Sequence, residues 1–193
     1  MVFVRNLPWY AQTEQVPREW KFFAAATLVP LLAGGVAVHY LPTKSESPPI
    51  EESDFDLARK VLGWDLHYAS LLVGAQAGLH WGMQAINFGQ PTHTLEYTPL
   101  YRFMRFGLPI VPLTVSILAS RLSIENPRAA SVLLLCVLAA STGVNFFAFA
   151  FATCPIWFTK FQWQLSAGIA SGLLLLMLSE RMKLVGELRA IEG

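Results

Sequence analysis

Charged residues are scarce in this chain, and their scarcity excludes several classes of protein. Asp, Glu, Lys and Arg make up 14% of the 193 residues, against about a quarter in soluble globular domains. Hydrophobic residues reach 54% and the mean hydropathy is +0.44, which is too apolar for an intrinsically disordered chain. A net charge of +1 leaves no basic surface for nucleic acid. The composition therefore predicts an integral membrane protein.

Cysteines and the common catalytic motifs are also missing or few. Cys136 and Cys154 are the two cysteines, and their spacing builds neither a disulfide framework nor a zinc site. The chain has no Gly-x-Ser-x-Gly, no P-loop, no His-x-x-x-His and no acidic pair within its apolar stretches. We therefore expect a protein that is not an enzyme, with no catalytic residues and no metal site.

Five long stretches contain no charged residue, and they show where helices cross the membrane. A bilayer core about 30 Å thick needs about 20 apolar residues as a helix, because lipid cannot satisfy unpaired backbone groups. We therefore predict an all-α integral membrane protein with five transmembrane helices and short interfacial helices at the ends and in the first loop. The spans lie near residues 22–41, 66–88, 101–122, 129–152 and 156–179. Pro109 and Pro112 should bend the third.

The chain divides into three parts around these spans. Residues 1–21 form an N-terminal interfacial segment, 22–179 the five-helix transmembrane domain, and 180–193 a C-terminal amphipathic tail. In the first loop, Ser53 precedes two acids and then two bases, which is typical of a helix N-cap and favours a short interfacial helix there.

The second predicted span carries three glycines on one face. Gly74, Gly78 and Gly82 follow each other at every fourth residue, so another helix backbone can approach closely. We expect a helix-packing groove for another helix of this chain, with the span 22–41 as its neighbour, or for a helix of a partner. The alternative is room for a flat ligand such as a quinone or haem.

The same span carries a polar stripe on a different face. Gln76, His80 and Gln84 also repeat at every fourth residue, about 200° around the helix from the glycines. Polar side chains inside a membrane are costly and indicate function, so the stripe could line the path of a carrier or channel. The simpler interpretation is hydrogen bonding between helices. The candidate partners are Gln162, Gln164, Asn145 and Ser141.

No charged residue lies deep in any predicted span. This absence counts against a proton relay, a voltage sensor or an ion-coupled transporter.

Three histidines are weak candidates for cofactor binding. His67 and His80 lie thirteen positions apart on one predicted helix, a spacing compatible with two stacked haems, but each iron needs a second ligand. His39 could face His67, whereas nothing matches His80. We therefore expect structural or interfacial histidines and no cofactor, with structural lipids such as cardiolipin as possible ligands.

Several short motifs resemble one known family. They are Val29-Pro30-Leu31-Leu32-Ala33-Gly34-Gly35, Tyr68-Ala69-Ser70-Leu71-Leu72, Gly78-Leu79-His80-Trp81-Gly82, Tyr101-Arg102 with Leu108-Pro109, and Pro155-Ile156-Trp157-Phe158 with Lys160 and Leu165. In order and spacing they resemble the transmembrane-protein-69-like family, five-helix inner-membrane proteins of unknown function from bacteria and mitochondria. The resemblance covers about residues 24–179. It departs from the family at Thr153-Cys154, where an acidic residue is usual.

The resemblance implies a multi-pass protein of the mitochondrial inner membrane, without implying any chemistry. Combined with the missing catalytic motifs, it predicts a non-catalytic accessory subunit of an inner-membrane complex, above all of the respiratory chain, acting in assembly or packing. Its partners would be membrane lipids and other subunits, with no nucleic acid. The alternatives are a subunit of the ATP synthase membrane region or an assembly factor, a small carrier or channel, and a quinone- or haem-binding membrane protein.

Overall fold

The computed structural model describes residues 15–40, 52–85, 106–150 and 156–178, and all regular structure in these ranges is helical. In chain order the helices are α2 (Arg18–Tyr40), α3 (Glu52–Ala85), α5 (Ile110–Glu125), α6 (Pro127–Ala150) and α7 (Ile156–Leu178). The predicted all-α class is confirmed. The N-terminal segment up to residue 14, the tail from 180 and the interfacial helices expected at the two ends lie outside the described residues.

Three of these helices, α2, α6 and α7, are long and apolar enough to cross a membrane. This agrees with the predicted membrane class. The other two predicted spans correspond to helices, but α5 has 16 residues, fewer than a bilayer crossing needs. Helix α3 has 34 residues and carries charges throughout its first half.

Helix α3 differs from its prediction in where it begins. A short interfacial helix near Ser53 and a separate span from residue 66 were expected, but one uninterrupted helix runs from Glu52 to Ala85. The sequence between them contains no proline, and the one glycine, Gly63, is tolerated inside a helix at a modest cost in stability. Charged residues therefore end at Asp65 within one continuous helix, whose remaining part is uncharged.

The third predicted span also differs, because its prolines mark a helix start. Pro109 occupies the N-cap position, where its carbonyl accepts a hydrogen bond from the Leu113 main-chain nitrogen at 3.3 Å. Pro112 lies in the first turn, where main-chain N–H groups have no partner within the helix. Neither proline removes a hydrogen bond within α5. Before α5, residues 106–107 are helical and residues 108–109 form a turn, so the predicted span is interrupted at Pro109. Residues 101–105 lie outside the described part of the chain.

Helices α5 and α6 form a tight antiparallel hairpin around one residue. The main-chain nitrogen of Asn126 donates to Leu122 O at 2.6 Å and ends α5. Its side-chain Oδ1 accepts from the nitrogen of Ala129 at 3.0 Å and caps the start of α6. Pro127 takes the first helical position, where its fixed φ angle suits a helix start.

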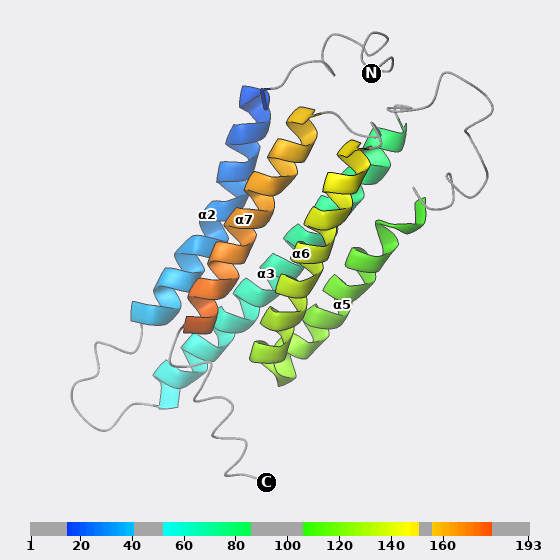
Figure 1. Ribbon diagram of the computed structural model, residues 1–193. Coiled ribbons are helices and arrows are strands. Elements are labelled where there is room, and N and C mark those ends of the chain that lie inside the picture. The colour runs from blue at the N-terminus through cyan, green and yellow to red at the C-terminus, as the bar shows by residue number, and fades with distance from the viewer. Residues whose placement is uncertain (1–14, 41–51, 86–105, 151–155, 179–193) are drawn as a thin grey trace, which may run out of the picture.

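Helix α3 lies against each of the other four described helices. Figure 1 shows α2, α7, α6 and α5 side by side in that order, with α3 crossing behind them. Neighbours in this row pack against each other, and α3 packs against all four. Because α3 touches every other described helix, side chains on its different faces can reach different partners.

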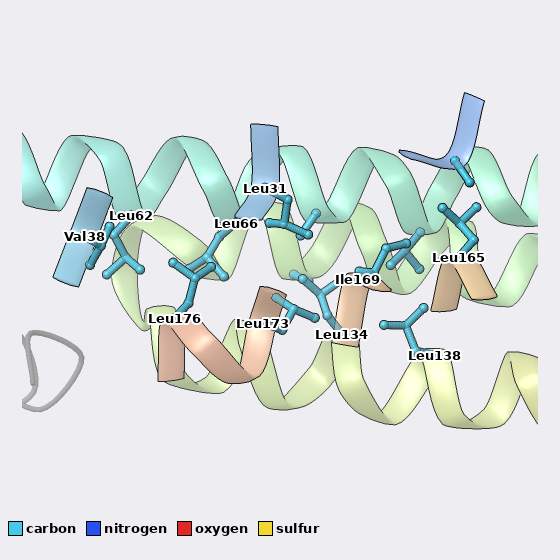
Figure 2. Close-up of a cluster of buried hydrophobic side chains, with 14 of the residues drawn as sticks. Leu31, Val38, Leu62, Leu66, Leu134, Leu138, Leu165, Ile169, Leu173 and Leu176 are labelled. Carbon is cyan, nitrogen blue, oxygen red and sulfur yellow. The ribbon is translucent and has the colours of Figure 1, made fainter. Parts of the chain in front are cut away.

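A continuous apolar core fills the space between these helices. Figure 2 shows leucines and an isoleucine of α3, α6 and α7 meeting Leu31 and Val38 of α2. The most deeply buried of these apolar side chains are Leu31, Val38, Leu66, Leu134, Ile169, Leu173 and Leu176. Helix α5 adds the small residue Ala119 to the same cluster, so it packs close to its neighbours without a large side chain.

The outer surface is apolar while several polar side chains lie inside. Trp64 is 79% exposed, Phe22 77% and Leu178 74%. In contrast, Gln76, Gln162 and Asn145 are buried. Large exposed apolar surfaces are rare on soluble monomers, and this distribution is the one expected of a bundle whose solvent is lipid.

Replacing Leu173 by Ala should destabilise the bundle, because the leucine is completely buried between α7 and its neighbours. We expect a loss of about 2 kcal/mol or more in the free energy of unfolding, since the packing contacts are lost and a cavity remains. Unfolding of the purified protein in mixed detergent measures this. The matched control is Leu174→Ala, at a position that is half exposed; an equal loss in both variants would contradict the observed packing.

Candidate functional site

Polar side chains on α3 form hydrogen bonds to three different helices. Tyr68 donates its hydroxyl proton to the carbonyl of Thr27 on α2, at 2.9 Å. This carbonyl follows directly after that of Ala26, whose main-chain hydrogen bond Pro30 removes from α2. His67 pairs through Nδ1 with the hydroxyl of Ser123 on α5 at 2.8 Å. These bonds tie α3 to α2 and α5.

Gln76 joins α3 to α7 at a buried polar contact. Its Nε2 donates to the hydroxyl of Ser166 at 2.6 Å and to the main-chain carbonyl of Gln162 at 3.2 Å. Gln162 returns a longer bond, from its Nε2 to the carbonyl of Gln76 at 3.4 Å. Both glutamines are almost completely buried. The side-chain amides therefore act as links between helices.

These bonds confirm one of the four predicted partners of the polar stripe. Gln162 contacts Gln76, whereas Gln164 is exposed and does not face this contact. Ser166, the nearest partner of Gln76, was not predicted. It lies one turn after Gln162, so the same helical spacing that defined the stripe on α3 could have identified it.

The rest of the stripe has a different environment. The imidazole of His80 packs edge-on against the ring of Phe158 on α7, with 5.4 Å between ring centroids. The side chain of Gln84 lies outside the described residues. Gln76 and His80 thus both face α7, one through hydrogen bonds and the other through an aromatic contact.

His39 and His67 do not face each other, so the haem-ligand pairing that the sequence left open is not formed. His39 Nε2 lies 2.9 Å from the carbonyl of Leu175 and joins α2 to α7, while His67 joins α3 to α5. The two rings belong to different helix interfaces because α3 crosses behind α2 and α7 (Figure 1). They cannot serve as the two axial ligands of one haem in this arrangement.

The glycine face of α3 packs differently from the prediction. A Cβ added to Gly74 would lie 3.2 Å from Leu113 Cδ1 and 3.2 Å from Ser116 Oγ, both on α5. At Gly78 and Gly82, no described atom lies within 4 Å of such a Cβ. Only the first glycine therefore packs against another described helix, and that helix is α5, so the expectation of α2 as its neighbour is wrong.

Several close glycine contacts lie instead between α2 and α7. A Cβ on Gly172 would lie 2.7 Å from Leu31 Cγ, and one on Gly35 would lie 2.9 Å from Leu175 Cδ2. Gly168 similarly faces Leu28. Leucines of each helix thus pack on glycines of the other. The side of α2 that carries Leu28, Leu31 and Gly35 therefore packs against α7. Gly168 and Gly172 form a Gly-x-x-x-Gly unit, the signal that could have revealed this contact.

Asp65 is a buried acid that the sequence did not reveal. The predicted span began at residue 66, which put Asp65 in the loop just before it. In the structure Asp65 lies within α3 and is 8% exposed, with its carboxyl group against Gly34 of α2. The prediction that no charged residue lies deep in a span referred to residues 66–88. Asp65 lies one residue before that range, and α3 continues without a break on both sides of it.

Replacing Gln76 by Leu should weaken the α3–α7 contact. We expect a loss of about 1 kcal/mol in the free energy of unfolding, the usual size of an interhelical hydrogen-bond effect in membrane proteins. The control is Gln164→Leu, the same substitution at an exposed position of α7. Unfolding in mixed detergent compares them, and an equal change in both would exclude a specific role for the buried amide.

Replacing Gly172 by Ala should destabilise the protein more than replacing Gly143 by Ala. The added methyl group overlaps Leu31 at the first position and meets no described atom within 4 Å at the second. In open space alanine favours a helix by about 1 kcal/mol over glycine, so Gly143→Ala should keep or raise the melting temperature. A melting temperature unchanged by Gly172→Ala would show that α2 and α7 do not pack this closely.

Comparisons with models of protein families, with curated proteins and with solved structures gave no match.

Proposed function

We propose that this chain is a non-catalytic accessory subunit of a multi-protein membrane complex, acting in assembly or packing. The observation that carries the proposal is that two sets of residues on α3 have different surroundings. Its buried polar side chains Tyr68, His67 and Gln76 bind neighbouring helices, while its glycines Gly78 and Gly82 have no described helix against them.

The interior supports a structural role because its polar groups are used in holding helices together. A site for a substrate would need polar groups directed into a shared space. Here Gln76 contacts α7, His67 contacts α5 and His39 contacts α7. Each of these bonds connects a different pair of positions on the helices, so they do not converge on one point.

The open part of the glycine face supports a role in association. Glycine in a helix costs stability relative to alanine, about 1 kcal/mol per residue in water. Close approach of another backbone offsets that cost. Gly74 has such a neighbour in α5, but Gly78 and Gly82 do not among the described residues. A helix of another subunit at this face would supply the missing contact.

The more specific assignment is to the mitochondrial inner membrane and to the respiratory chain. It is supported by the motif resemblance to the transmembrane-protein-69-like family and by the membrane character of α2, α6 and α7. In this setting the other subunits and structural lipids such as cardiolipin are its partners. Fractionation of mitochondria followed by immunodetection of the chain tests the location.

A carrier or channel is supported less well than a structural subunit. Gln76 and Asp65 lie on the same side of α3, eleven residues and so about 16 Å apart along the helix. Between their levels the interior is filled by apolar side chains, among them Leu31, Ala69 and Leu173, all completely buried. Polar groups separated by a packed apolar core do not form a continuous path.

Native electrophoresis and mass spectrometry of gently solubilised membranes test the proposal directly. A subunit should migrate in a band much larger than its own 21.4 kDa and together with other membrane proteins. Co-migration with oxidoreductase subunits would support the respiratory chain specifically. Migration as a free small protein would contradict the proposal.

Replacing Gly78 by Leu should reduce assembly into the complex and leave the folding of the chain unchanged. The isolated chain should fold normally, because no described atom lies within 4 Å of the position, whereas the amount recovered in the large complex should fall. The control is Gly63→Leu, on the same helix and also in open space. Equal recovery of both variants in the complex would argue against the glycine face as the contact with a partner.

A further inference from the structure

The carboxyl group of Asp65 lies where α3 crosses α2. A Cβ built on Gly34 would overlap both carboxyl oxygens and the Cγ of Asp65. The absence of a side chain at Gly34 therefore makes room for the acid. Gly34 is half-buried and Asp65 is more than nine-tenths buried, so the two residues form one enclosed position between the helices.

No donor satisfies this carboxyl group in the part of the chain that the structure describes. Oδ2 is buried and has no hydrogen-bond partner there. A carboxylate without a partner is very costly in an apolar interior, and such a group usually becomes neutral instead. Even with a partner, removing an ion from water costs several kcal/mol. The ionised form of Asp65 is thus strongly disfavoured in this position.

Among the described residues, no cationic side chain is found against the acid. On α2 the nearest titratable group is His39, whose Nε2 pairs with Leu175 O. On α3, Arg59 and Lys60 are exposed at the preceding turns, while His67 and Tyr68 are bonded to Ser123 and to the Thr27 carbonyl. Helix α7 carries no titratable side chain between Gly168 and Leu178, the part that packs on α2.

Apolar side chains form the rest of the surroundings. Leu62, Leu66 and Ala69 lie within four residues of Asp65 on α3, and Leu31 and Val38 lie within four residues of Gly34 on α2. All five belong to the buried core, and Figure 2 shows Leu62 and Leu66 beside Val38 and Leu31. The two carboxyl oxygens of Asp65 are therefore enclosed by apolar side chains, and no described cation lies beside them.

We propose that Asp65 is a proton-binding site within the helix bundle. The bound proton converts the carboxylate to a neutral acid, and the space at Gly34 holds this acid between α2 and α3 at neutral pH. The site is independent of the proposed role in a complex, because it depends only on contacts within the chain. Release of the proton places a negative charge at the crossing of the two helices.

Infrared spectroscopy of the purified full chain in lipid tests the proposal directly. At neutral pH the protein should show the carbonyl stretch of a protonated carboxylic acid, and Asp65→Asn should lose it. Asn is the matched variant because it has nearly the size of the acid and is neutral at all pH values, so it should fold normally. If the band is missing from the parent, or persists unchanged in Asp65→Asn, the proposal fails.

Labelling with the membrane-permeant reagent dicyclohexylcarbodiimide provides a second measurement, since this reagent needs a protonated carboxyl group. Mass spectrometry of the labelled full chain at neutral pH should find the adduct on Asp65 and none on Glu19 or Glu125, which are exposed on the same protein. The adduct should decrease as the pH is raised. Protection of Asp65 by sodium or potassium ions at constant pH would overturn the proposal, because the site would then bind a metal cation.

Discussion

Polar groups inside an apolar bundle must find their partners on neighbouring helices, and the arrangement of this protein depends on that constraint. Water and lipid cannot satisfy a buried amide or hydroxyl here, so each such group has to bond within the bundle or remain costly. Tyr68 meets this requirement on α2, His67 on α5 and the amide nitrogen of Gln76 on α7, while Gln76 Oε1 has no partner among the described residues. Because all three belong to α3, the helix can satisfy them together only by crossing the bundle behind the other four.

Steric complementarity between leucine and glycine determines the second set of contacts. Leu28 and Leu31 of α2 pack on Gly168 and Gly172 of α7, and Leu175 of α7 packs on Gly35. This reciprocal packing brings the two helices close enough for His39 to reach the carbonyl of Leu175. The adjacent glycine, Gly34, accepts the carboxyl group of Asp65 from α3. Two consecutive glycines thus serve two different helices, because neighbouring residues point to different sides of a helix.

The buried acid and the open glycine face belong to different parts of α3 and support different inferences. Asp65 lies in the interior against α2, whereas Gly78 and Gly82 lie more than three turns further along, where no described helix approaches them. A change of charge at Asp65 would act first on the α2–α3 crossing, since that is where the carboxyl group is enclosed. A partner helix at Gly78 would leave that crossing untouched. The protein therefore combines an interior in which polar side chains link the helices with a part of α3 at which an added Cβ would meet no described atom within 4 Å.

The sequence by itself determined the membrane character, the all-α class and the approximate position of five helices, because charge scarcity and apolar runs are local properties of the chain. It also identified Gln162 as a partner for the stripe on α3, since intramembrane amides are few. It misassigned the partner of Gly74, it left open a pairing of His39 with His67 that the structure does not form, and it missed the burial of Asp65. Those features depend on which helices become neighbours. The segments 74–82 and 168–172 both carry Gly-x-x-x-Gly units. Only the tertiary structure decided that Gly172 packs closely on α2, whereas a Cβ on Gly78 would meet no described atom within 4 Å. The physical reason is that a glycine creates space for any backbone or side chain, and the crossing of α3 decides what occupies it.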